Sequence, residues 1–211
     1  MEFKQNNLIK SLRSQPLIVV IRIEDQFFSL PKKRQGLFLK IEELSNYGIK
    51  NIEIGWNSNP EWINLILEIK KKFNSVNIGA ASISSRQSLD SILSLDLNYS
   101  MSPVFNKEIH LKAIKHNQLV IPGISNIENF KEAIDLGYKV VKIFPASKLG
   151  INFIKKLKEL DKNDIFFIGA GGIKSTHLKK LLNSGYDTLV IGRELQNQTP
   201  DEDLKIWLKD Y

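Results

Sequence analysis

VVKIFPAS, residues 140–147, is a run of β-branched and aromatic residues that closes on a proline and a small polar turn. Such a run is typical of a strand covered on both faces, as in the parallel sheets of α/β proteins. The run contains one lysine, Lys142, and a buried ammonium group is costly unless it is paired or loses its proton. Two interpretations follow: Lys142 reaches solvent from an edge strand, or it is a desolvated amine with nucleophilic character.

The same kind of strand recurs along the chain, and helical patterns separate the copies. We expect strands over 16–22, 50–54, 76–80, 97–101, 118–121, 139–144, 164–169 and 187–192. We expect helices over 3–14, 36–46, 60–73, 86–95, 106–116, 126–136, 150–160, 174–184 and 201–209. Eight consecutive strand–helix units predict an α/β protein with a closed (β/α)₈ TIM barrel and a short N-terminal helix, formed by residues 1–211 as one domain. An open Rossmann-type sheet is disfavoured, because residues 22–30 contain no glycine-rich turn.

Composition excludes several classes of site. The chain has no cysteine, so disulfides and thiolate chemistry are excluded. Its three histidines, His110, His116 and His177, are far apart in the sequence and are expected on solvated helix faces, so we expect no metal site. There is no apolar run of 18 residues and no signal-peptide pattern at the N-terminus, which predicts a cytoplasmic protein without a membrane partner.

A net charge of +7 raises the question of nucleic-acid binding. The lysines are spread over the predicted helices, and many lie three or four residues from an acidic residue, as Lys155 does from Glu159. This pattern is typical of a solvated surface, and no aromatic and basic reading motif accompanies it. We therefore expect no nucleic-acid partner.

Alternation along the barrel strands predicts which side chains point inward. If the apolar residues on either side face the helices, then Arg22, Glu53 and Lys142 point into the barrel near its carboxyl end, where barrel enzymes place their active sites. A buried structural ion triad is the alternative, but such triads gain little stability over apolar packing. Convergence at the barrel mouth favours a functional role.

These three side chains suit one reaction. Lys142 would condense with a 2-oxo group, Glu53 would transfer protons, and Arg22 would hold a carboxylate. Ser82, just after the third strand, would add a hydroxyl group. A protonated imine withdraws electrons, so the adjacent C3–C4 bond of a 2-oxo acid can break. The chemistry predicted is a retro-aldol cleavage.

IGAGGIKSTHL, residues 168–178, predicts a second half of the site. Its strand runs through Gly171 and Gly172 into a helix N-terminus, where free backbone N–H groups bind phosphate in many barrel enzymes. The alternative is that the glycine pair only forms the turn. After the eighth strand, Gly192 permits close approach and Arg193 adds charge, whereas Glu194 is expected to point away.

With these residues identified, the chain resembles the 2-keto-3-deoxy-6-phosphogluconate (KDPG) aldolase family from about residue 16 to residue 195. VVKIFPAS is similar to the family's Schiff-base motif and assigns the nucleophile to Lys142; IEIGWNS, residues 52–58, assigns the acid/base role to Glu53. PLIVVIR assigns the substrate carboxylate to Arg22, and IPGIS and GAGGI match the family's glycine turns. We also expect Pro103 and Phe144 to line the substrate site.

The resemblance implies a class I aldolase without metal or cofactor, usually a homotrimer, that releases pyruvate and glyceraldehyde 3-phosphate. Asn57 stands where some KDPG enzymes carry arginine and resembles the 6-phosphogalactonate branch, so both epimers remain open, as does 4-hydroxy-2-oxoglutarate. Ala81, Ala170 and Arg193 also depart from the family pattern, which keeps a non-catalytic sugar-phosphate-binding relative as an alternative. Trp56, Trp62 and Phe105 are expected at a subunit interface.

Overall fold

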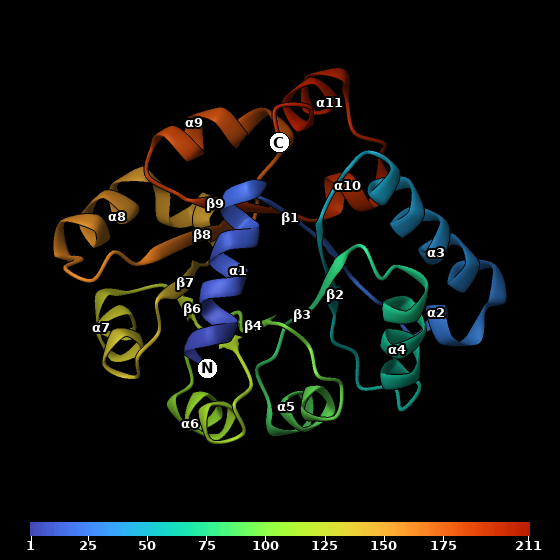
Figure 1. Ribbon diagram of the computed structural model, residues 1–211, viewed down its shortest axis with the longest axis horizontal. Helices are drawn as coiled ribbons and strands as arrows, with labels where there is room; N and C mark the ends of the chain where they lie inside the picture. The colour runs from blue at the N-terminus through green and yellow to red at the C-terminus, as the bar shows by residue number, and fades with distance from the viewer.

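Nine short parallel strands form the centre of the protein, and helices surround them (Figure 1). The computed structural model describes residues 1–211. The strands are β1 (Leu17–Ile21), β2 (Asn51–Gly55), β3 (Asn77–Ala81), β4 (Ser100–Met101), β5 (Val120–Ile121), β6 (Gly123–Ile124), β7 (Val140–Ile143), β8 (Phe166–Ala170) and β9 (Thr188–Ile191). They pair in the order β5-β4-β3-β2-β1-β9-β8-β7-β6, which confirms the predicted barrel.

The barrel closes through Pro122, which lies between β5 and β6. Proline has no backbone N–H, so the ladder is interrupted there: β5 pairs with β4, and β6 pairs with β7. The Lys142 N–H donates to the Pro122 carbonyl at 2.9 Å, so a hydrogen bond also joins β7 to the residue between β5 and β6. The two short strands are halves of one barrel strand, so the single strand expected over 118–121 was too short.

Helices follow the strands and cover the outside of the barrel (Figure 1). They are α2 (Gln26–Ser29), α3 (Pro31–Asn46), α4 (Trp62–Lys72), α5 (Arg86–Leu93), α6 (Lys107–Lys115), α7 (Ile127–Asp135), α8 (Ala146–Leu160), the 3₁₀ helix η1 (Ser175–His177), α9 (Leu178–Asn183), α10 (Arg193–Asn197) and α11 (Glu202–Leu208). Polar side chains cap the N-termini of α5, α6, α7 and α11. Ser85, Asn106, Asn126 and Asp201 each accept a hydrogen bond from a backbone N–H of the first turn.

The N-terminal helix α1 (Glu2–Ser14) lies across one end of the barrel, in front of the strands in Figure 1. Gln5 donates to the Gly137 carbonyl at 3.1 Å, and its side-chain oxygen accepts from the Lys139 N–H at 2.7 Å. Leu8 and Leu12 are buried, and each such side chain stabilises the fold by about 1.5–3 kcal/mol. Since residues 137–139 precede β7, α1 closes the amino ends of the strands and leaves the carboxyl ends open.

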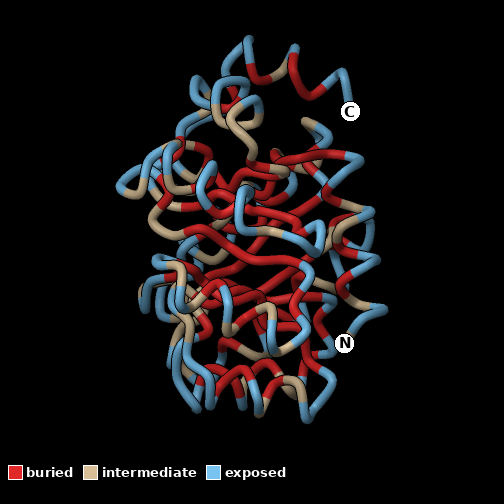
Figure 2. The backbone as a smooth tube through the Cα atoms, turned by 90° about the vertical axis from the view of Figure 1, so that its left-hand side faces the viewer, coloured by how far each residue is buried: buried red, intermediate tan, exposed pale blue.

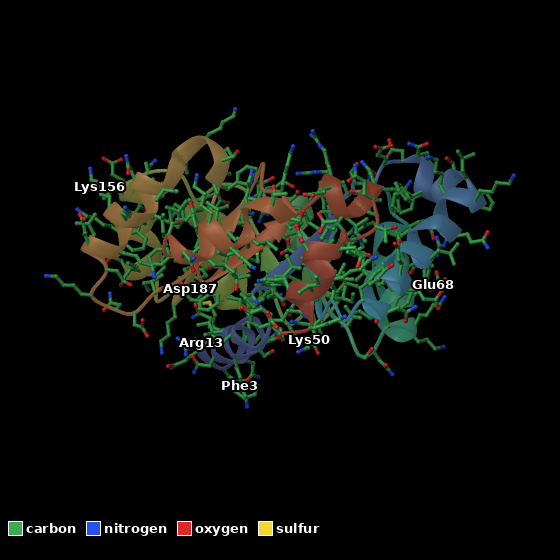
Figure 3. The ribbon with its side chains drawn as sticks, turned by 90° about the horizontal axis from the view of Figure 1, so that it is seen from above. Phe3, Arg13, Lys50, Glu68, Lys156 and Asp187 are labelled. Carbon is green, nitrogen blue, oxygen red and sulfur yellow. The ribbon has the colours of Figure 1, made fainter.

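The core is one continuous apolar cluster that runs through the barrel and under the helices, seen as the buried interior of the tube in Figure 2. Apart from Glu53 and Lys142, the charged side chains are at least partly exposed at the periphery. Lys156 and Glu68 stand at opposite outer edges of the molecule in Figure 3, and Glu68 contacts Arg34 of the neighbouring helix. None of the helices combines the length and apolar character that a membrane-spanning segment needs.

The structure corrects several element boundaries. The strand expected over 97–101 pairs only at its end, as β4. The helix expected over 150–160 begins at Ala146 and breaks at Gly150, whose φ of 73° is not helical. The segment 174–184 divides into η1 and α9, and the short helices α2 and α10 were not predicted. Pieces of three to six residues carry too little periodicity to be recognised in a sequence.

Two side chains lie elsewhere than predicted. His110 is buried, not solvated: its ring stacks on Phe105 at 5.2 Å, and its Nδ1 lies 3.0 Å from the Tyr138 hydroxyl. Burial lowers the pKa of His110 to about 4. Trp62 is also buried and donates to the Gly55 carbonyl at 2.9 Å, so it is no interface residue. In both cases the helix rotates the aromatic side chain towards the barrel, where its polar atom finds a partner.

Candidate active site

A cavity of about 540 Å³ opens at the carboxyl ends of the strands. Ten of the predicted site residues line it: Arg22, Glu53, Ser82, Pro103, Lys142, Phe144, Gly171, Gly172, Gly192 and Arg193. These residues come from seven different strands or the turns that follow them. The barrel therefore brings to one place side chains that lie up to 171 positions apart in the sequence.

Lys142 projects from β7 into the base of this cavity. Its neighbours Val141 and Ile143 are fully buried on the other face of the strand, and Lys142 itself is only 6% exposed. The ammonium lies 5.3 Å from the centre of the Phe144 ring. Burial lowers the pKa of Lys142 to about 8, and the charge of Arg22 adds to this effect while Glu53 opposes it. The result is a lysine with a substantial fraction of free amine near neutral pH.

Glu53 is the acidic counterpart of Lys142 inside the barrel. It lies on β2, is 2% exposed, and its Oε1 has no hydrogen-bond partner. Burial raises the pKa of Glu53 to about 7, although the charge of Lys142 acts in the opposite direction. The two groups thus have much closer pKa values than their ordinary 4.5 and 10.5. A proton moves between such groups at little free-energy cost, which suits acid/base work.

Arg22 stands at the mouth, directly after β1. Gln196 of α10 holds its backbone with two hydrogen bonds, accepting from the Arg22 N–H at 3.0 Å and donating to its carbonyl at 3.1 Å. Asn57 does not line the cavity. Its amide donates to Asp25 at 3.1 Å and its oxygen accepts from the Asn59 N–H at 2.8 Å, so it orders the loop that follows β1.

Two further loops contribute to the cavity wall. Ser82 follows β3 with a φ of 68°, a left-handed conformation that is uncommon for a residue with a side chain and is concentrated at functional sites. Pro103 reaches the cavity because Gly123 permits it: a Cβ at Gly123 would lie 2.4 Å from the Pro103 carbonyl. Both residues contact the same space as Lys142.

The glycine turn after β8 forms the other end of the cavity. Gly171 and Gly172 have φ values of 92° and 72°, and the N–H groups of Gly171, Gly172 and Ile173 donate to no protein acceptor. A Cβ at Gly172 would lie 2.2 Å from Ser147 Oγ, so the close approach of the two turns requires glycine. Successive free N–H groups in this conformation form an anion-binding concavity.

Basic side chains outnumber acidic ones among the residues that line the cavity. Arg193 begins α10, and Lys148 and Lys174 also line the cavity, so that five basic side chains stand against two carboxylates. Glu194 is among the residues around the cavity, but its carboxylate accepts from the Ser175 N–H at 2.9 Å and the Ser175 hydroxyl at 2.7 Å, which caps η1. The excess of positive charge favours a substrate with more than one negative charge.

Sequence reasoning missed three residues of this site. Lys148 stands directly after VVKIFPAS and Lys174 lies within IGAGGIKSTHL, so their position next to a predicted anion site was the signal available. Gln196 had no such signal. It lies 174 positions from Arg22, and only closure of the barrel between β9 and β1 brings the two together.

Comparison with known proteins identifies relatives of this chain. A family model described as KDPG and KHG aldolase matches residues 8–205. The 2-dehydro-3-deoxy-6-phosphogalactonate aldolase of Escherichia coli is 26% identical over 149 residues, which cover 70% of this chain and 72% of the relative.

Solved structures of aldolases share the fold. A KDPG aldolase of Zymomonas mobilis with 3-phosphoglycerate is 22% identical, with 96% of this chain and 93% of that chain covered and a TM-score of 0.76. A KDPG aldolase of Legionella pneumophila, with pyruvate captured at low pH as a covalent carbinolamine intermediate, is also 22% identical, with coverages of 94% and 91% and a TM-score of 0.74. Because the family model spans nearly all of the barrel, this chain belongs to the KDPG and KHG aldolase family.

Proposed function

We propose that the protein is a class I aldolase that cleaves a 2-keto-3-deoxy-6-phospho sugar acid to pyruvate and glyceraldehyde 3-phosphate. The observation that carries this proposal is a buried lysine whose pKa is lowered to about 8, beside a buried glutamate whose pKa is raised to about 7. An amine in this state is a nucleophile towards carbonyl carbon. The covalent pyruvate adduct of the Legionella pneumophila relative supports the same chemistry.

The first half of the reaction forms an imine. The Lys142 amine attacks C2 of the substrate, and the oxygen at C2 becomes a hydroxyl group. Loss of that hydroxyl as water, with a proton from Glu53, leaves a protonated imine. Arg22 binds the C1 carboxylate by charge-assisted hydrogen bonds and aligns C2 with the amine. Burial of the site excludes bulk water and strengthens these interactions.

The second half breaks the carbon–carbon bond. Glu53 removes the proton from the C4 hydroxyl, the C3–C4 electron pair moves towards the imine, and C4 leaves as an aldehyde. The remaining enamine takes a proton at C3, and hydrolysis of the imine frees pyruvate and the Lys142 amine. Every proton removed is returned, and the C3–C4 electron pair ends in the new C–H bond of pyruvate, so the cycle is redox-neutral.

The glycine turn accounts for the other end of the substrate. The free N–H groups of Gly171, Gly172 and Ile173 suit a phosphate, and Arg193 and Lys174 supply charge beside them. Since Asn57 turns towards Asp25, we assign it no direct substrate contact. The proposal leaves the gluconate and galactonate epimers as alternatives, with 4-hydroxy-2-oxoglutarate as a further substrate that shares the pyruvate half.

Pyruvate release from each of these three compounds tests the proposal, measured by coupling to lactate dehydrogenase. We expect cleavage of at least one phosphorylated epimer. If the protein binds these compounds, as followed by calorimetry, but releases no pyruvate from any of them, then it is a sugar-phosphate-binding relative and not an aldolase.

Arg193→Ser tests the phosphate end of the site. A hydrogen bond from a guanidinium to a phosphate contributes roughly 1.5–3 kcal/mol, so the substitution should raise KM for a phosphorylated substrate about tenfold or more. KM for 4-hydroxy-2-oxoglutarate should change far less, because its pyruvate half binds at Lys142, Glu53 and Arg22. Steady-state kinetics on both substrates measures this difference. Equal effects on the two, or a lower KM for the phosphorylated one, would remove Arg193 from the phosphate site.

The family resemblance also implies a homotrimer, and we propose that this chain forms one. Val104 and Leu111 are 52% and 49% exposed, beside the half-buried Phe105. Apolar side chains of this kind are typical of subunit interfaces. Light scattering should give three times the mass of the chain, and Val104→Glu should weaken the assembly. A wild-type protein that stays monomeric at micromolar concentration would contradict this.

A further inference from the structure

Tyr99 lies inside the barrel, next to Glu53. Its side chain is fully buried. A Cβ added to Gly79 would lie 2.5 Å from Cζ of Tyr99, the ring carbon that carries the hydroxyl group. Gly79 pairs directly with Glu53 across β2 and β3. The hydroxyl-bearing end of Tyr99 therefore occupies the space over Gly79, beside the strand position from which Glu53 projects.

Two polar atoms in this place have no partner. The Tyr99 hydroxyl and Glu53 Oε1 are both buried, and neither makes a hydrogen bond to another protein group. Leaving a buried donor and a buried acceptor unpaired carries a large free-energy penalty, which native proteins avoid. Because one atom is a donor, the other an acceptor, and they are neighbours without a direct hydrogen bond, one enclosed water between them can satisfy both.

Packing alone does not explain the hydroxyl group. The ring of Tyr99 fills the volume that Gly79 leaves open, and a phenylalanine ring would fill it equally well. A phenylalanine would also leave no unpaired hydroxyl in the barrel. The hydroxyl is thus the part of the residue that a role in packing does not require.

We propose that Tyr99 is a positioning residue for Glu53: through one enclosed water its hydroxyl donates to the Glu53 carboxylate and fixes the orientation of the group that exchanges protons with the substrate. The assignment of a proton-transfer role to Glu53 rests on the proposed function, whereas the proximity of the two side chains does not. A hydrogen bond to the carboxylate favours its ionised form and so counteracts part of the effect of burial. Burial and the charge of Glu53 raise the pKa of Tyr99 well above 10, so the hydroxyl keeps its proton and remains a donor.

The charged groups that act on Glu53 are few. Lys142 faces it from β7, and Arg22 stands after β1. Lys148, Lys174, Arg193 and Glu194 line the same cavity. A substitution that removes only the Tyr99 hydroxyl leaves all of these charges in place, so a change in the titration of Glu53 reports on the hydroxyl itself.

Tyr99→Phe tests the proposal, with Tyr186→Phe as its matched control. Tyr186 is also buried, its hydroxyl also has no partner, and its ring also packs over a strand glycine, Gly169. It lies on the other side of the barrel wall, and its pKa is raised by burial without a contribution from Glu53. Both variants lose one buried hydroxyl from a comparable environment.

The readout is the ionisation of Glu53, followed by infrared spectroscopy of its carboxylic C=O band and assigned by the loss of that band in Glu53→Gln. We expect the midpoint of the titration to rise by about 1 pH unit in Tyr99→Phe and to stay unchanged in Tyr186→Phe. Incorporation of 3-fluorotyrosine at position 99, which strengthens the donor, should move the midpoint in the opposite direction. The measurement on the fluorotyrosine protein remains informative if Tyr99→Phe folds poorly.

An unchanged midpoint in Tyr99→Phe and in the fluorotyrosine protein would overturn the proposal and leave Tyr99 as a packing residue. An equal shift in Tyr186→Phe would also overturn it, because the effect would then be a general response to a lost buried hydroxyl. The measurement needs no turnover. Failure of the aldolase proposal would appear separately, as the absence of pyruvate release by the wild-type protein.

Discussion

Lys142→Arg is expected to abolish aldol cleavage, with a loss of roughly 10⁴-fold or more, while the barrel stays folded. Arginine keeps the positive charge but does not lose its proton near neutral pH, so no neutral amine is available to attack the 2-oxo group. The guanidinium also cannot form the imine that withdraws electrons from the C3–C4 bond. Pyruvate release and covalent trapping should therefore disappear together.

Lys142→Met separates this chemical effect from stability. It removes a buried ammonium and supplies an apolar side chain of similar length, which is often neutral or stabilising in a protein interior. We expect a thermal midpoint equal to or above that of the wild type, measured by circular dichroism, and no activity. Undiminished cleavage by Lys142→Arg would contradict the assignment of the nucleophile.

Glu53→Gln is expected to slow cleavage by about 10²-fold or more, because the amide cannot accept the C4 proton or return one to C3. Imine formation with pyruvate should survive in part, since the amine of Lys142 remains. Lys142→Arg and Glu53→Gln therefore have different defects: Lys142→Arg loses the covalent step, and Glu53→Gln loses proton transfer. Rapid-quench measurement of imine and product in the same samples distinguishes them.

The Glu53 substitution should also change the pH dependence of imine formation. In the wild type, the charge of Glu53 raises the pKa of Lys142 and opposes the effect of burial. Removing that charge lets the pKa fall below about 8, so the free amine is present at lower pH. Trapping of pyruvate at several pH values should then show its midpoint moved to lower pH. A Glu53→Gln protein with full activity and an unmoved midpoint would make Glu53 a structural residue.

The sequence was enough to predict the barrel, because short apolar strands alternate regularly with helices, most of which are long and periodic. The inward positions of Glu53 and Lys142 followed from alternation about apolar neighbours, which is a local property. The division of one strand at Pro122 and the break of α8 at Gly150 depend on single backbone positions, which a pattern over a dozen residues does not resolve.

Side-chain orientation on loops and helix ends was harder to predict. The Glu194 carboxylate turns to Ser175, 19 positions away, because the N–H at the start of η1 needs an acceptor. His110 is buried because Tyr138 and Phe105 meet it there, and Asn57 turns aside because Asp25 offers a partner. All of these contacts except the one between Phe105 and His110 join residues from different strand–helix units, so they exist only once the units have packed together.

The central claim is that Lys142 forms a covalent imine with a 2-oxo acid. The most direct test is to incubate the protein with pyruvate and sodium cyanoborohydride, digest it, and locate the added mass by peptide mass spectrometry. The account predicts one reduced pyruvate adduct per chain, on the peptide that contains Lys142, and none in Lys142→Arg. A chain that gains no mass, or adducts spread over the exposed lysines with Lys142 unmodified, would contradict it.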